Sequence, residues 1–261
     1  MNQSQKDKLR ELINQNLDRA EKIWVEEGDK LVVMDESVGA EAAMLLEKAE
    51  SAPSYIPGYP IVNSDHNEVA TFIALVADMR DSSKHLLCDI TSKIAKVSML
   101  QRVYYETSAL LPALAQTIAY EKGAVTEYLG DGVLAFFKVD EDDESDAIYA
   151  AHRAAKDCIN ICRVMVNDEL EKRYNLPSLD LGVGLACSKA LITLVGLEGA
   201  KQAKAFGECV FRATKLSGGK NCIYTDTKLE AMWPTSSVGG GLRFKRKQIS
   251  GVEGYLIEGK I

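Results

Sequence analysis

Two aspartates, each placed where an apolar run meets a turn, constrain this chain more than any other feature. Asp78 follows an unbroken apolar run over residues 72–77, so it is expected where a buried strand gives way to a loop. Asp131 lies between two glycines and directly precedes a second apolar run over residues 133–137. Asp-Gly is a strong signal for a tight turn between two strands. If the two strands are neighbours, both carboxylates lie at one edge of a sheet.

Such a pair is suited to divalent cations. Hard cations take oxygen ligands and keep open positions for water and for substrate phosphates. Asp78, Asp131 and the backbone carbonyl of Met79 would therefore suffice to bind two Mg²⁺ or Mn²⁺ ions. The alternative is purely structural: aspartate is also favoured as a helix cap and in hairpin turns.

Three segments, in this order, resemble the catalytic domain of class III nucleotidyl cyclases. They are Asp-Met-Arg-Asp-Ser-Ser at 78–83, Leu-Gly-Asp-Gly-Val-Leu-Ala-Phe-Phe at 129–137, and Ala-Phe-Gly-Glu-Cys-Val-Phe-Arg-Ala-Thr-Lys-Leu at 205–216. The resemblance covers residues 68–260. It implies an α+β, ferredoxin-like palm fold, with an antiparallel-rich sheet and helices. The implied activity is that of a phosphorus–oxygen lyase, which converts a nucleoside triphosphate to its 3′,5′-cyclic monophosphate and pyrophosphate. The resemblance also implies a homodimer with active sites shared between the protomers.

The loop after Asp78 is expected to bind the triphosphate. The backbone N–H groups of Arg80, Asp81, Ser82 and Ser83 would begin a helix, where free donors and the positive end of the helix dipole attract anions. The family usually has glycine where this chain has Asp81.

Base recognition is expected at Glu127 and Lys204. Adenylate cyclases of the family have a lysine and an aspartate or threonine at these places, and guanylate-making relatives have a glutamate and a cysteine. A glutamate accepts hydrogen bonds from uracil, cytosine or guanine, and a lysine donates to a ring carbonyl, so the residues alone leave the base open. The alternative is a surface ion pair of little energetic consequence.

The combination of this pair, the 78–83 loop and a short helical extension resembles the bacterial pyrimidine cyclases of antiphage systems. These make cyclic UMP or cyclic CMP for a separate effector protein. We therefore expect UTP or CTP as the substrate, with guanylate or adenylate cyclase as the alternative.

The third segment departs most from the family. Phe211 and Lys215 stand where the family places a transition-state asparagine and arginine, and Arg212 could supply the missing guanidinium from the same helix. These replacements also fit a second hypothesis, a catalytically silent module that binds a nucleotide or a partner. A third hypothesis, a polymerase-like or diguanylate cyclase palm enzyme, lacks its Gly-Gly-Asp/Glu-Glu-Phe hairpin.

The chain is expected to divide near residue 60. Residues 1–60 read as a helical extension with apolar residues at helical spacing, followed by a linker over 51–60 with three prolines; residues 61–261 form the cyclase domain. Within that domain we expect a strand at 69–78, helices at 84–122, 144–172 and after Gly207, strands at 179–186, 191–197 and 222–225, a final hairpin around Gly251, and all helices on one face of the sheet.

Composition narrows the function further. The net charge of −7 argues against a nucleic-acid surface, and neither a membrane segment nor a signal peptide is visible, so we expect a cytoplasmic protein. Six scattered cysteines read as buried thiols, and the spacing of the histidines at 66, 85 and 152 indicates neither a metal site nor a catalytic triad.

Overall fold

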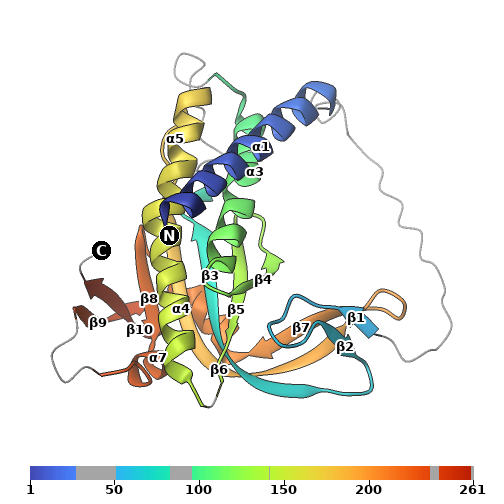
Figure 1. Ribbon diagram of the computed structural model, residues 1–261, viewed down its shortest axis with the longest axis vertical. Helices are drawn as coiled ribbons and strands as arrows, with labels where there is room; N and C mark the ends of the chain where they lie inside the picture. The colour runs from blue at the N-terminus through green and yellow to red at the C-terminus, as the bar shows by residue number, and fades with distance from the viewer. Residues whose placement is uncertain (28–50, 83–95, 141, 236–240, 260–261) are drawn as a thin grey trace.

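The computed structural model describes residues 1–27, 51–82, 96–140, 142–235 and 241–259 (Figure 1). The helices are α1 (Gln3–Glu27), α3 (Met99–Ala119), α4 (Glu144–Asp157), a π-helix η2 (Cys158–Cys162), α5 (Arg163–Tyr174), α6 (Glu208–Leu216) and α7 (Thr227–Ala231). The strands are β1 (Ser51–Pro53), β2 (Ile61–Asn63), β3 (Glu68–Met79), β4 (Ala124–Tyr128), β5 (Gly132–Lys138), β6 (Leu181–Val195), β7 (Gln202–Gly207), β8 (Cys222–Asp226), β9 (Leu242–Ile249) and β10 (Val252–Gly259).

The main sheet has the order β4-β5-β3-β6-β8-β10-β9, with β7 paired to β6. In the described residues all its pairs are antiparallel except β6 with β8. The expected α+β fold with an antiparallel-rich sheet and an N-terminal helix is confirmed. The apolar runs that contain the two aspartates are β3 and β5, and they are direct neighbours in this sheet.

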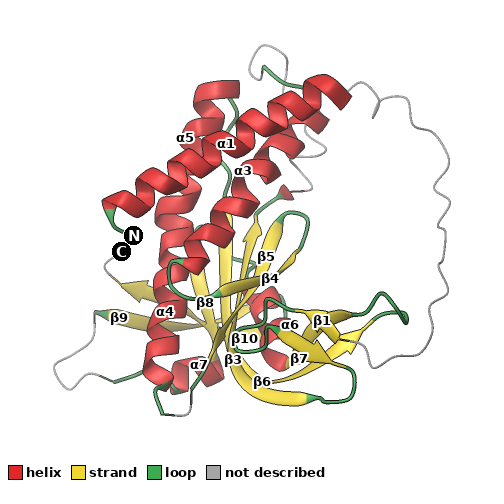
Figure 2. Ribbon diagram, turned by 45° about the vertical axis from the view of Figure 1, so that its right-hand side comes forward, coloured by secondary structure: helices red, strands yellow, loops and turns green. Residues whose placement is uncertain are grey.

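Helices cover both faces of the sheet, so the expectation that they lie on one face is wrong. On one face the odd-numbered residues of β3, such as Ile73 and Leu75, pack against α1, α3, α4 and α5. On the other face the even-numbered residues Phe72 and Ala74 pack against Cys209 and Ala213 of α6 (Figure 2). Side chains alternate between the faces of a strand, so a strand without polar residues needs cover on both sides.

One long strand, β6, replaces the two strands expected at 179–186 and 191–197. It remains paired with β3 from Leu181↔Met79 through to Ile192↔Glu68. The break expected between them does not occur, because Lys189 stays in the ladder opposite Thr71 with its side chain exposed. Beyond this point β3, β6 and β7 extend past the helices as an arm (Figure 1).

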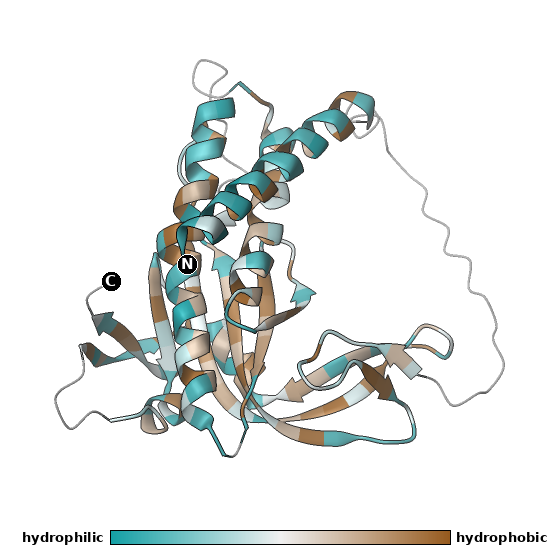
Figure 3. Ribbon diagram, in the orientation of Figure 1, coloured by the Kyte–Doolittle hydropathy of each residue, from teal (hydrophilic) through white to brown (hydrophobic). Residues whose placement is uncertain are grey.

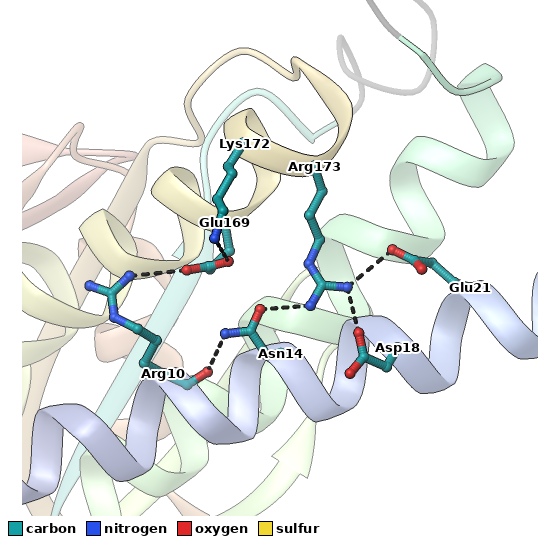
Figure 4. A network of polar contacts seen from close by, with 7 residues as sticks. All are labelled: Arg10, Asn14, Asp18, Glu21, Glu169, Lys172 and Arg173. Atoms are coloured by element: carbon teal, nitrogen blue, oxygen red, sulfur yellow. Dashed lines mark hydrogen bonds and ion pairs between the residues drawn. The ribbon is translucent and has the colours of Figure 1, made fainter.

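Helix α1 packs on the helices of its own chain. Leu9, Ile13 and Leu17 are fully buried in the same apolar cluster as α3 and α5. Along its polar side a network joins α1 to α5, in which Arg173 contacts Asp18 and Glu21 (Figure 4). In Figure 3 brown and teal residues alternate along α1, as expected for an amphipathic helix.

The proline-rich segment expected as a linker folds as a small hairpin. Strands β1 and β2 pair with the register Ala52↔Val62, and Ile56 and Val62 are buried against the α6 face of the sheet. Proline tolerates this position because β1 and β2 pair only with each other and leave an edge free. The boundary at residue 60 stays a prediction. Of the helix expected over 84–122, the structure describes α3, and residues 83–95 lie outside the described residues.

Candidate active site

Asp78 and Asp131 lie side by side at one edge of the sheet. Asp78 is opposite Gly132 in the β3–β5 register, and the Met79 N–H donates a 3.1 Å hydrogen bond to the carbonyl oxygen of Asp131. Both side chains are partly exposed. The juxtaposition follows from the turn after β4, which places Asp131 one residue before the paired strand begins.

Burial and neighbouring charges alter the titration of Asp78. The pKa of the Asp78 carboxyl is raised to about 6, first by burial and then by the negative charge of Asp131, while the Arg80 guanidinium lowers it. Arg80 Nη1 lies 2.9 Å from Asp78 Oδ2 and 3.3 Å from the carbonyl oxygen of Ser217. In this structure Arg80 therefore supplies the positive charge next to Asp78.

Gly132 keeps the space between the two strands open beside Asp78. A Cβ at this position would lie 2.5 Å from the carbonyl oxygen of Ala77 and 3.0 Å from Asp78 Oδ1. Gly130, with φ +87°, allows the turn that brings Asp131 to this edge. The two glycines around Asp131 thus have different roles, one in the turn and one in the close approach of β5 to β3.

The donor set fits hard divalent cations. The negative charge of Asp131 raises the pKa of Asp78, so a cation placed between the two carboxylates would be favourable, and oxygen ligands suit Mg²⁺ or Mn²⁺. Within the described ranges no group of three acidic, histidine or cysteine side chains forms a fuller metal site. Asp78 and Asp131 would hold the cations with the Met79 carbonyl, and water and substrate oxygens would complete the coordination.

One expected phosphate contact is wrong. The Arg80 N–H donates a 2.8 Å hydrogen bond to the carbonyl oxygen of Asp180, so it is not available to a phosphate. This happens because the loop leaves β3 alongside the residue that precedes β6. Asp81 has a left-handed backbone with φ +58°, which explains why glycine suits this place in the family and why aspartate is tolerated. Triphosphate binding by Asp81 and Ser82 stays a prediction, and Ser83 lies outside the described residues.

Asp180 is a site residue that the sequence reasoning missed. Its carboxylate binds Lys220 Nζ at 2.6 Å and Asn221 Nδ2 at 2.5 Å, while its backbone holds the Arg80 loop. These contacts lower the pKa of Asp180 despite the opposing effect of burial. The sequence does show an aspartate just before an apolar strand. It does not show the partners of this aspartate, because they are distant in the chain; Asn221, for example, is 41 residues away from Asp180.

Glu127 and Lys204 are brought together. Glu127 Oε2, from β4, lies 3.2 Å from Lys204 Nζ, from β7, and both side chains remain partly exposed. Lys204 is opposite Thr193 in the β6–β7 register, so it lies on the face of the arm that is turned toward β4. Their role in base recognition stays a prediction.

The three residues predicted on α6 are divided between two interactions. Phe211 is 59% exposed, and Lys215 Nζ lies 5.7 Å from the centroid of its ring. Arg212 instead pairs with Glu208 at 2.6 Å along the same helix. Whether Arg212 or Lys215 acts in a partner's site stays a prediction.

Comparisons with known proteins bear on the fold. No family model matches the sequence, and no curated protein sequence matches it significantly. Among solved structures, a guanylyl cyclase is similar with a TM-score of 0.57 at 16% identity, over 73% of this chain and 91% of the other. The adenylyl cyclase CyaB from Pseudomonas aeruginosa is similar with a TM-score of 0.57 at 12% identity, over 75% of this chain and 97% of the other.

A third similar structure, a class III adenylyl cyclase-like ATP-binding protein from Pseudomonas aeruginosa, gives a TM-score of 0.51 at 17% identity over 63% of this chain and 34% of that one. Each helix in the described part of the chain is too short or too polar to cross a membrane. The chain has the cyclase palm fold of the class III adenylyl and guanylyl cyclase structures.

Proposed function

We propose that this protein is a class III nucleotidyl cyclase that converts UTP or CTP to its 3′,5′-cyclic monophosphate and pyrophosphate. The observation that supports this most is the pair of carboxylates at the end of β3 and the start of β5, in a chain with the palm fold of the cyclases. The reaction is an attack of the ribose 3′-hydroxyl on the α-phosphorus, with pyrophosphate leaving.

Asp78 and Asp131 would hold the two cations. When bound, the cations supply a lower pKa for the ribose hydroxyl and positive charge beside the triphosphate. Arg80 neutralises Asp78 in the free protein. Once cations take over that role, its guanidinium is free to turn toward the triphosphate, with Asp180 holding its backbone in place.

The pyrimidine preference rests on Glu127 and Lys204. Together they offer an acceptor for the N3–H of uracil or the amine of cytosine and a donor for the O2 carbonyl that both bases share. Their 3.2 Å contact in the free protein keeps the two groups within the span of one ring edge. The adenine-reading lysine of the family is absent at position 127.

A homodimer is part of this proposal because one face of the arm exposes apolar side chains in the described structure. Val69, Leu191 and Phe206 are opposite one another across β3, β6 and β7, and we call them the arm row. They are 61%, 41% and 53% exposed. They lie on the same face as Lys204, which pairs with Thr193 two residues from Leu191. A second protomer on this face would cover apolar surface and bring its carboxylates to the base-reading pair.

The decisive experiment is incubation of the purified protein with each of UTP, CTP, ATP and GTP plus Mn²⁺, with products identified by mass spectrometry. We expect cyclic UMP or cyclic CMP. Asp131→Asn, which removes the charge and keeps the shape, should abolish the product while circular dichroism and the thermal midpoint show an intact fold. Cyclic GMP or cyclic AMP alone would refute the pyrimidine preference and keep the cyclase activity.

A charge swap separates base recognition from a mere surface ion pair. Glu127→Lys with Lys204→Asp keeps the pair with reversed polarity and restores the residue types found in adenylate cyclases of the family. We expect the ratio of cyclic AMP to pyrimidine product to rise at least tenfold. An unchanged substrate ratio with retained activity would leave the pair without a role in base choice.

The silent module remains the alternative, supported by the exposed Phe211 and by the absence of a free guanidinium at Arg212 in the described structure. It predicts nucleotide binding without turnover of any of the four triphosphates. A linear or dinucleotide product would favour a polymerase-like enzyme instead. The antiphage role and the separate effector follow from the family resemblance and can be tested by phage challenge of cells that express the wild type or Asp131→Asn.

A further inference from the structure

A pocket of about 300 Å³ lies on the face of the sheet that α4 covers, and neither Asp78 nor Asp131 lines it. It is bounded by the junction of α4 with the π-helix on one side and by the ends of β8, β9 and β10 on the other. Its apolar wall is formed by Ile159, Ile223, Leu242, Leu256 and Ile257. The volume is enough for a body of one or two rings.

The helical side of the pocket is polar. His152, Lys156 and Asn160 recur at intervals of four residues, so they follow one stripe of the helix and all line the pocket. The π-helix begins at Cys158, between the second and the third of these residues. Single π-turns of this kind are frequent at functional sites because they re-aim the side chains of a helix.

His152 is the most informative member of the stripe. His152 is only 7% exposed, and its ring packs edge-on against Trp233. The ring forms no hydrogen bond with any residue in the described ranges. Burial, with the nearby charges of Lys156 and Arg153, lowers the pKa of the imidazole to about 4, so the ring is neutral at pH 7. A neutral imidazole carries one N–H donor and one acceptor, and both are free to meet a ligand in the pocket that His152 lines. Within the described ranges, the side chains of Lys156 and Asn160 likewise form no hydrogen bond or ion pair.

The pocket adjoins the support of the candidate active site. Asn221 lines it and donates to Asp180 Oδ1 at 2.5 Å, and the Asp180 carbonyl accepts from the Arg80 N–H at 2.8 Å. The same Asn221 also accepts from the Leu181 N–H through its side-chain oxygen. A shift of Asn221 therefore acts directly on the residue that holds the loop after Asp78.

We propose that this pocket is a second ligand site, which binds a small molecule with an apolar, ring-sized body and one anionic group, and that its occupancy is transmitted to the Arg80 loop through Asn221 and Asp180. The apolar body lies against the strands, and the anion accepts hydrogen bonds from the stripe of His152, Lys156 and Asn160. The charge is single because Lys156 is the one Lys or Arg among the described residues of the lining, which also include the carboxylate of Glu258 on β10.

The test uses the protein without nucleotide or cations, labelled with ¹⁵N in its histidine rings. The chain has three histidines, and His66→Gln and His85→Gln assign the His152 signals by subtraction. The probes are 2-naphthoate and its uncharged counterpart 2-naphthamide. We expect 2-naphthoate to shift the His152 signals in a saturable way and to bind at least tenfold more tightly than the amide. Lys156→Met should remove that tenfold advantage, whereas Lys22→Met, at an exposed lysine of α1, should leave it unchanged.

Several results would overturn the proposal. The first is the absence of any shift of the His152 signals up to about 5 mM 2-naphthoate, since binding weaker than this would not make a useful site. The second is an equal effect of Lys156→Met and Lys22→Met. The third is a set of shifts confined to the exposed His66. In a second, uniformly ¹⁵N-labelled sample, a backbone amide signal of Arg80 that does not move at saturation would refute the transmission through Asn221. Because no step of the test measures turnover, its outcome is independent of the proposed cyclase activity.

Discussion

Strands β3 and β6 each have two halves that differ sharply in their surroundings. In β6 the first eight residues are buried on both faces, whereas from Lys189 onward burial alternates with exposure. In β3 the same change occurs in reverse, with exposed residues at Glu68 and Val69 and a buried run from Phe72. The centre of the sheet is covered by α1, α3, α4 and α5 on one face and α6 on the other.

Among the described residues, the two faces of the arm differ in cover, and one face is packed. There the β1–β2 hairpin packs over Ala190 and Ile192, while the arm row on the opposite face meets solvent. One pair of hydrogen-bonded strands therefore serves two purposes. The centre is stabilised within the chain and fixes the position of the carboxylates, and the arm presents an exposed apolar face in the described part of the chain.

The largest effect on activity is expected at Asp78, where the buried centre of β3 ends. Asp78→Asn should lower the rate of product formation by about 10³-fold or more, because the amide keeps the shape but cannot neutralise a cation. Initial rates with the preferred triphosphate measure this. The fold should remain intact because Asp78 is partly exposed and its β3 neighbours carry the packing. A loss of less than tenfold would mean that the pair at this edge is not the cation site.

A second prediction contrasts the two halves of β6 directly. Leu185→Ala, at a fully buried position in the centre, should lower the free energy of unfolding by about 3 kcal/mol, whereas Leu191→Ala in the arm row should change it by less than about 0.5 kcal/mol. Urea denaturation at a protein concentration too low for dimers gives both values. Equal losses would refute the distinction between centre and arm.

The centre should also be the acid-sensitive part. The pKa of His152 is lowered to about 4 in the folded protein, against 6.5 in the unfolded chain. The folded state therefore binds fewer protons, and stability present above pH 6.5 is lost as the pH falls toward 4. Linkage gives a loss of about 2 kcal/mol between pH 7 and pH 5. His152→Gln should remove this contribution, read in urea denaturation as the difference in pH dependence between variant and wild type, because the raised pKa of Asp78 acts in the opposite direction over the same range. Identical pH dependence in the two proteins would refute the role of His152.

The sequence predicted local features well because they depend on neighbours in the chain. The Asp-Gly turn before Val133 gave the β4–β5 hairpin, and the apolar run before Asp78 gave β3; their pairing and the meeting of the two aspartates followed. The helix expected over 144–172 is found as α4, η2 and α5 in continuous succession. Each of these is specified by a few residues with defined turn or helix chemistry.

What could not be predicted depends on contacts between distant segments. The α6 face was missed because the small residues Cys209 and Ala213 give no signal of which sheet face they cover. The hairpin of the proline-rich segment owes its order to Ile56 and Val62 packing on the sheet. Asp180 gained its role only through Lys220, Asn221 and Arg80. Tertiary packing decides such cases, and local propensity does not record it.

The smallest expected effect tests the uncovered face itself. Phe206→Ser should weaken self-association by about tenfold and lower product formation in parallel, because an exposed aromatic at the centre of an interface contributes strongly to binding and little to the monomer. Tyr55→Ser is the matched control, since Tyr55 is also exposed but lies between β1 and β2, outside the arm row. Sedimentation velocity over a range of concentrations measures the self-association of both variants, and initial rates measure their product formation. If the two variants dimerise like the wild type, the arm row is not the contact between protomers, and the arm must be covered by something other than a second copy.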